Sequence, residues 1–120
     1  MFELDVENSK PIYEQLMDKF KELMINDVLQ EHNQLPSIRI LARELTINPN
    51  TIQKAYKQLE SDGYIYTLPG KGNFVAPPTS LKNSLEEKIR NDLEKVFAEA
   101  LYIGIDKHEI YRLLEKGGDS

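Results

Sequence analysis

The fold is decided by residues 48–63, which read NPNTIQKAYKQLESDG. Asn48 is a good helix N-cap, and Pro49 suits the first helical position, where the backbone N–H would have no partner. We expect the helix to run to about Ser61, because Gly63 can adopt the left-handed conformation that ends helices. One face of this helix is apolar at positions i, i+3, i+4 and i+7 and is expected to be buried: Ile52, Ala55, Tyr56 and Leu59.

The opposite face of this helix carries amides, one hydroxyl and two amines, with no acid before Glu60. Amide side chains can pair with an adenine edge, and threonine can bond a base or touch a thymine methyl. Taken alone, the helix fits an ordinary amphipathic helix with a neutral polar face equally well. If it reads DNA, the expected base contacts come from Asn50, Thr51 and Gln53, and the expected phosphate contacts from Lys54 and Lys57.

A second helix is expected directly before this one. Pro36 blocks continuation of the preceding segment, and Ser37 can cap a short helix over residues 38–44. A three-residue turn, residues 46–48, then leads into the longer helix, as in a helix–turn–helix. Arg39 lies in the first turn of the short helix, where it could clamp a phosphate or reach a guanine. The alternative for Arg39 is a surface salt bridge, for example with Glu44.

A β-hairpin is expected after the longer helix. Residues 64–67 and 73–75 are rich in β-formers and flank the turn Leu68-Pro69-Gly70-Lys71-Gly72. The alternative to a functional role is a plain β-turn. As a wing, Gly70 and Gly72 would let the backbone approach the sugar–phosphate chain, and Lys71 would add positive charge. The predicted fold is mainly α-helical with a small β-hairpin, an N-terminal winged helix–turn–helix.

Charge is unevenly distributed along the chain. The net charge of −5 argues superficially against nucleic acid. Residues 1–35 hold three lysines against eight acids, whereas residues 36–76 hold five basic side chains against three acidic ones. The local field decides where a phosphate can dock, so the balance of residues 36–76 is the relevant one.

Composition restricts the remaining function classes. The chain has no cysteine, no stretch of about 20 apolar residues and no basic-then-apolar start, so we expect a cytoplasmic protein without a membrane span. The two histidines, His32 and His108, are far apart in sequence and have no metal-ligand spacing or phosphate loop near them. We therefore expect no enzyme activity, no metal and no cofactor.

The ends of the chain are predicted to be helical. A helix is expected over residues 11–26, with Pro11 as its first residue, followed by a connection at residues 31–34. After a linker at residues 76–78, a long helix is expected from Thr79 or Ser80 to Gly104, and a last helix from Asp106 to residues 117–118.

These elements divide the chain into a DNA-binding domain, residues 1–76, and a helical region, residues 77–120. The apolar stripes of the two tail helices need a partner surface, and a second copy of the chain supplies one. The predicted tail is therefore a short two-helix dimerisation region. The alternative is that the tail packs on its own winged domain. At the dimer interface, Tyr102, His108 and Tyr111 either pack or line a small-molecule effector site.

Several spaced segments closely resemble the GntR family of bacterial transcription regulators over about residues 11–76. These segments are LPSIRILA at 35–42, NPNTIQKAY at 48–56, LESDG at 59–63 and GKGNFV at 70–75. The NPNTIQKAY run and the short tail resemble the YtrA subfamily. The resemblance implies a homodimer on a palindromic operator, usually a repressor and often beside genes of an ABC transporter. It also implies DNA contacts from Arg39, Asn50, Thr51, Gln53, Lys54 and residues 70–72.

The sequence departs from the family pattern at three positions. Ile40 stands where many members have a glutamate that completes a capping box. Pro49 and Gln53 stand where many have arginine, so a base contact from Pro49 is excluded and the operator sequence cannot be transferred. The remaining alternative function is a winged-helix module that binds another protein without DNA, which would need apolar anchors on the exposed face of residues 50–61.

Overall fold

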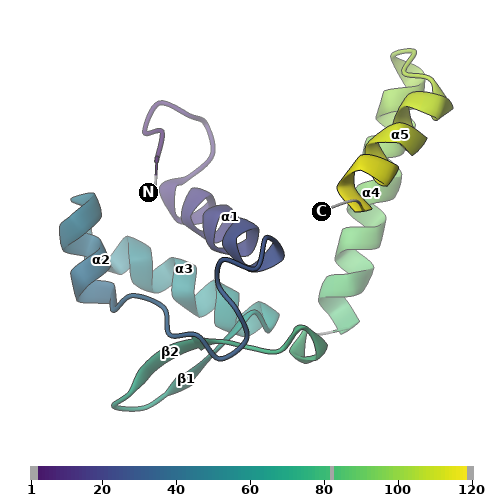
Figure 1. Cartoon of the computed structure of the whole chain (residues 1–120). Coiled ribbons are helices and arrows are strands. Elements are labelled where there is room, and N and C mark those ends of the chain that lie inside the picture. Colours follow the sequence, from purple (N-terminus) through teal and green to yellow (C-terminus); the bar gives the residue numbers. More distant parts are fainter. Residues whose placement is uncertain (1–2, 82, 119–120) are drawn as a thin grey trace. The chain divides into compact units, whose positions relative to one another are not determined.

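The computed structural model describes residues 3–81 and 83–118. These residues form two compact units that divide after Leu81, and Figure 1 shows their elements. The N-terminal unit holds three helices and a two-stranded hairpin, and the C-terminal unit holds two helices. The predicted class, mainly α with a small β-hairpin, is confirmed.

The three helices of the N-terminal unit are α1 (Ile12–Ile25), α2 (Ile38–Leu45) and α3 (Pro49–Asp62). The side chain of Ser37 accepts a hydrogen bond from the Ile40 N–H at 3.1 Å, which caps α2 as predicted. The side chain of Asn48 accepts one from the Asn50 N–H at 2.9 Å, and Pro49 opens α3. At the start of α1 the prediction was one residue early, because Pro11 has an extended ψ of 149° and is the cap.

The hairpin pairs β1 (Ile65–Leu68) with β2 (Gly72–Val75) in antiparallel register, with Ile65 opposite Val75. Both strands begin one residue away from the prediction, a normal uncertainty at element ends. The connection at residues 32–35 also pairs with β2. His32 N–H donates to the Val75 carbonyl and Leu35 N–H to the Asn73 carbonyl, each at 2.8 Å. This third strand-like segment was not predicted, because its sequence, HNQL, lacks the alternating pattern of a strand.

The core of the N-terminal unit lies between α1 and α3 and is closed by α2 and the hairpin. Its fully buried side chains come from all three helices: Leu16, Phe20, Leu41, Ile52 and Leu59. The buried stripe predicted for residues 52–59 is confirmed, since all four of its members are less than 4% exposed. Ile38 and Leu45 of α2 are partly buried and pack against this core.

The C-terminal unit consists of α4 (Asn83–Tyr102) and α5 (Lys107–Gly118). The prediction that the long helix begins at Thr79 or Ser80 is wrong. Residues Pro78–Ser80 instead form one 3₁₀ turn. Pro77 before it is extended, Pro78 has a helical φ, and neither proline has a backbone N–H to donate. Gly104 breaks the helices with a φ of 100°, and the Asp106 carboxylate caps α5 by accepting from the His108 N–H at 3.1 Å.

Candidate nucleic-acid interface

The exposed face of α3 is the centre of the candidate interface. Asn50, Gln53 and Lys57 are exposed, and Thr51 is half-buried at the start of the helix. The first turn of α3 carries no acid, so the positive end of the helix dipole is uncompensated by protein carboxylates. No large apolar side chain of α3 is exposed within the described residues. This face can therefore donate and accept hydrogen bonds but offers no apolar anchor to a protein partner.

Lys54 has a contact that the sequence did not reveal. Its Nζ lies 4.1 Å from the ring centroid of Tyr13, which is the second residue of α1. Burial, together with the neighbouring Glu14 carboxylate, raises the pKa of Tyr13, so the ring is a neutral phenol. A cation over such a ring is held by the ring quadrupole. The Tyr13 ring of α1 thus orients the Lys54 ammonium on the exposed face of α3. Tyr13 was not among the predicted site residues, and its role is to position Lys54.

The wing is shaped by its two glycines. Gly70 and Gly72 have φ angles of 77° and 130°, which side-chain-bearing residues rarely adopt. The Lys71 N–H donates to the Leu68 carbonyl at 2.9 Å, which closes the turn, and the Lys71 side chain is exposed. The structure thus brings the wing residues together at one exposed tip, where the backbone is accessible.

Gln34 braces this wing from the segment before α2, and sequence reasoning missed it. Its Nε2 donates to the Lys71 carbonyl at 3.0 Å. The same atom would lie 2.7 Å from a Cβ placed on Gly72, so a glycine is required for this close approach. No local pattern marks Gln34, because its partner is 37 residues later in the sequence.

An aromatic cluster forms on the hairpin strands. Tyr66 stacks on Phe74 with ring centroids 5.5 Å apart, and His32 Nδ1 lies 2.7 Å from the Tyr66 hydroxyl. Within this cluster His32 has a structural partner rather than a catalytic one. No group of three or more histidines or acids that could hold a metal occurs within residues 3–81 and 83–118.

Arg39 is exposed in the first turn of α2. In the part of the chain that the structure describes, it forms no ion pair, so the alternative of a bridge to Glu44 is not realised. Its neighbour Ile40 is 51% exposed, and only its backbone N–H takes part in the capping contact of this turn. The guanidinium is therefore free to meet a phosphate.

The acids of α1 are partly neutralised within the N-terminal unit. Lys10 bonds Asp18 at 2.7 Å, and Lys19 lies 3.8 Å from Glu22. The basic side chains of the candidate interface, by contrast, have no acidic partner within the described residues. Arg39, Lys54, Lys57 and Lys71 thus keep their positive charge available to an anion. Across the described helices, none is both long and apolar enough to cross a bilayer.

An α2–turn–α3 pair with an exposed amide-and-amine face, followed by a glycine-tipped hairpin, defines a winged helix–turn–helix transcription regulator. Residues 12–75 match the profile of the gntR family of bacterial regulatory proteins. The chain belongs to this family and is a DNA-binding transcription regulator, not an enzyme.

Individual relatives support the predicted YtrA subfamily. The HTH-type transcriptional repressor YtrA of Bacillus subtilis (strain 168) is 34% identical over 118 residues, 97% of this chain and 91% of the relative. A transcriptional antiterminator from Listeria monocytogenes EGD-e has a TM-score of 0.87 at 36% identity, covering 97% of this chain and 88% of the other. YtrA from Sulfolobus acidocaldarius, a GntR-family transcription factor, has a TM-score of 0.70 at 32% identity, covering 84% and 97%.

Proposed function

We propose that this protein is a cytoplasmic, homodimeric repressor that binds a palindromic operator, and that the operator controls an ABC transporter operon. The observation that carries the DNA-binding mode is the exposed face of α3, which has no acid in its first turn, followed along the chain by a glycine-tipped wing. The repressor role is supported by the likeness to the Bacillus subtilis repressor over 97% of the chain.

Each predicted residue has a role in this proposal. Asn50, Thr51 and Gln53 read base edges in the major groove, because residues at the start of the second helix reach furthest into it. The remaining residues hold the backbone of the duplex and set the register. They are Arg39, Lys54, Lys57, Gly70, Lys71 and Gly72.

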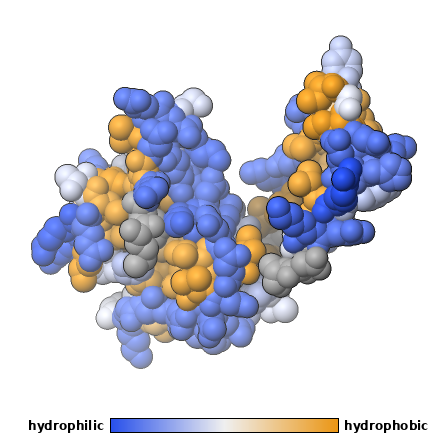
Figure 2. All heavy atoms as spheres, turned by 45° about the horizontal axis from the view of Figure 1, so that its top comes forward, coloured by the Kyte–Doolittle hydropathy of each residue, from blue (hydrophilic) through white to orange (hydrophobic). Residues whose placement is uncertain are grey.

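The homodimer in this proposal forms through α4 and α5. Their apolar side chains remain exposed within the C-terminal unit, as Figure 2 shows, and include Ile89, Leu93, Val96, Leu101, Tyr111, Leu113 and Leu114. A contiguous exposed apolar surface of this kind usually marks an interaction site. A second copy covers it and brings two reading helices to two half-sites on one face of the duplex.

Selection of bound DNA from a random pool tests the proposal as a whole. We expect two half-sites related by two-fold symmetry, and an affinity that falls steeply with salt, since each phosphate contact releases counterion with a slope of about 0.9. A selected pool without symmetry would contradict the palindromic operator. A pool without any enriched sequence would contradict base reading by α3.

Gln53→Ala separates base reading from phosphate binding. We expect this variant to lose about 1–3 kcal/mol of discrimination at one base pair per half-site, because the exposed amide of Gln53 contacts a base edge. The matched control is Lys57→Ala, one turn further along α3. It is expected to weaken all sequences alike and to reduce the salt slope by about one per half-site. Titrations on operators with single base changes measure both effects, and a uniform loss for Gln53→Ala would remove it from the reading set.

A further inference from the structure

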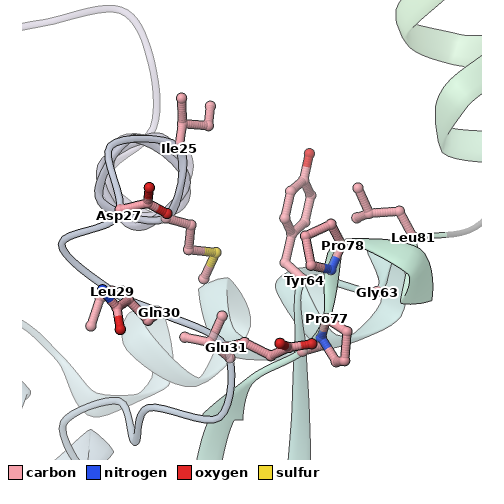
Figure 3. A pocket seen from close by; sticks show the side chains of 13 residues that line it. Ile25, Asp27, Leu29, Gln30, Glu31, Gly63, Tyr64, Pro77, Pro78 and Leu81 are labelled. Atoms are coloured by element: carbon pink, nitrogen blue, oxygen red, sulfur yellow. The ribbon is translucent and has the colours of Figure 1, made fainter. Parts of the chain in front are cut away.

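A pocket in the N-terminal unit lies on the far side of the hairpin from the wing tip. Its volume is about 640 Å³, within the range of small-molecule sites. Figure 3 shows the end of α1 and the following loop on one side, and Tyr64 with the segment Pro77–Leu81 on the other. The apolar part of its lining comes from Met24, Ile25, Leu29, Val75, Pro77, Pro78 and Leu81.

The charged part of the lining is of one sign. Asp27 and Glu31 are the ionisable acids that line the pocket, and the lining contains no lysine, arginine or histidine. Neither carboxylate has an ion pair or a side-chain hydrogen bond in the described ranges, 3–81 and 83–118. The neighbouring base, Lys21, instead lies 4.9 Å from the ring centroid of Tyr64. Two exposed carboxylates therefore line this largely apolar pocket without an ion-pair partner.

Tyr64 lines the same pocket on the side opposite the end of α1. Burial raises the pKa of its hydroxyl, and the negative charge of Asp62 raises it further, so the ring stays a neutral phenol. An aromatic face attracts cations, and unpaired carboxylates attract them more strongly. An anion would meet two like charges, and a neutral molecule would gain nothing from either carboxylate.

We propose that this pocket binds a small organic cation, an alkylammonium or amidinium with an apolar body. The apolar body fills the space between Ile25 and Leu81, and the cationic group lies between the carboxylates of Asp27 and Glu31. The charge complementarity selects this occupant over neutral and anionic molecules of the same size.

The pocket is also lined by the end of α3 and by the segment of the N-terminal unit that precedes residue 82. Gly63, which lines it, is the residue that ends α3, and Pro77, Pro78 and Leu81 lead to residue 82. A Cβ on Gly63 would lie 2.5 Å from the Ser80 carbonyl oxygen, so this segment rests directly on the end of α3. Resting on the proposed function, we infer that occupancy of the pocket changes operator affinity, through differential contacts with these two segments.

Calorimetric titration of the full chain without DNA tests the ligand class. The probe is hexyltrimethylammonium, and the matched compounds of similar length are 1-heptanol and hexyl sulfate. We expect the cation to bind about tenfold or more tightly than either, since only the cation is attracted by the two carboxylates. Equal binding of the alcohol overturns the cation assignment. If none of the three compounds binds, the pocket is not a ligand site, and the proposal is overturned. The same result is expected if another part of the chain occupies the pocket.

Charge-neutral variants locate the binding. Asp27→Asn/Glu31→Gln removes both charges, and asparagine tolerates the φ of 60° at position 27, so the fold is preserved. We expect the double variant to bind the cation about tenfold more weakly. Glu7→Gln/Glu60→Gln makes the same change in net charge at two acids that do not line the pocket and is expected to bind normally. Equal losses in both variants would place the cation elsewhere and overturn the assignment.

Operator titration with and without saturating hexyltrimethylammonium tests the coupling. We expect a change of about fivefold or more in operator affinity for the wild type and none for Asp27→Asn/Glu31→Gln. Cation binding that leaves operator affinity unchanged overturns the regulatory inference alone. Failure of the protein to select any DNA would instead contradict the proposed function, while the titration without DNA would still decide the ligand site.

Discussion

Tyr56 is the side chain that joins the two helices of the DNA-binding motif. It is 3% exposed, and its hydroxyl donates to the Pro36 carbonyl at 2.8 Å, just before α2 begins. Its ring meets Phe20 of α1 edge-on, with centroids 5.6 Å apart. One residue thus fixes the distance between α2 and α3 and supports both against α1. Its polar group is satisfied, which is the condition for burying a tyrosine.

Tyr56→Phe is expected to lower the free energy of unfolding by about 1 kcal/mol, because it removes one buried hydrogen bond and leaves the ring contacts intact. Urea unfolding at neutral pH, followed by circular dichroism, measures the change. Tyr66→Phe serves as a control, since the Tyr66 hydroxyl bonds an exposed histidine at the surface. A loss for Tyr56→Phe no larger than that of the control would contradict the role of the Pro36 bond.

The same tyrosine makes stability depend on alkaline pH. Burial raises the pKa of Tyr56 far above the ordinary value of 10.0. The neutral phenol is therefore favoured by folding, and its contribution is complete below pH 10 and is lost as the pH rises above that value. We expect the unfolding free energy of the wild type to fall from pH 9 to pH 11 more steeply than that of Tyr56→Phe. Parallel curves for the two proteins would contradict this assignment.

At the scale of elements, the wing depends on a segment outside the hairpin. Residues 32–35 pair with β2, and Gln34 holds the Lys71 carbonyl while packing on Gly72. A bond across the hairpin, from Thr67 Oγ1 to Asn73 Oδ1 at 2.8 Å, supports the same turn. An isolated two-stranded hairpin is marginal in water, so these contacts are what keep the tip in one conformation.

Gly72→Ala tests this dependence. The φ of 130° strains any side chain, and the new Cβ would meet Gln34 Nε2 at 2.7 Å, so we expect a cost of about 1–3 kcal/mol in stability and weaker operator binding. Adding Gln34→Ala removes the steric part and not the backbone strain. The double variant should therefore recover some stability, measured by urea unfolding. A double variant that behaves additively would show that the two residues do not interact.

The local rules that predicted the helices explain which elements were found from the sequence and which were not. The caps at Ser37, Asn48 and Gly63 act within four residues, so their sequence signals are complete, and α2 and α3 were predicted to within one or two residues. The strand-like pairing of residues 32–35, the Gln34 brace and the Lys54–Tyr13 contact join positions 37 to 43 residues apart, which no local pattern contains. α4 starts later than predicted because the 3₁₀ turn ends at Leu81, whose backbone is extended with a ψ of 136°.

The charge of the whole chain differs in sign from that of its DNA-binding surface. The net charge is −5, yet the four basic side chains of the interface have no acidic partner within the described residues. One copy of such an interface presents few phosphate contacts, and the acids elsewhere oppose the approach of DNA. Two linked copies avoid this limit, because the second half-site is bound at a high effective concentration. The exposed apolar residues of α4 and α5 are therefore part of the proposed binding mechanism.

Leu93→Glu tests the link between the tail and DNA binding. Leu93 is 47% exposed and follows Ile89 by one helical turn, with Val96 three residues further on, so the three form one apolar stripe on α4. A carboxylate there would be desolvated by a second copy, so we expect a monomer in sedimentation experiments and operator affinity lower by about a hundredfold. Asn91→Glu adds the same charge on the opposite face of α4 and should remain dimeric with full affinity. If Leu93→Glu also remains a dimer, the copies meet through another surface. If it becomes monomeric yet binds the operator normally, each half-site is read independently and the tail has a different purpose.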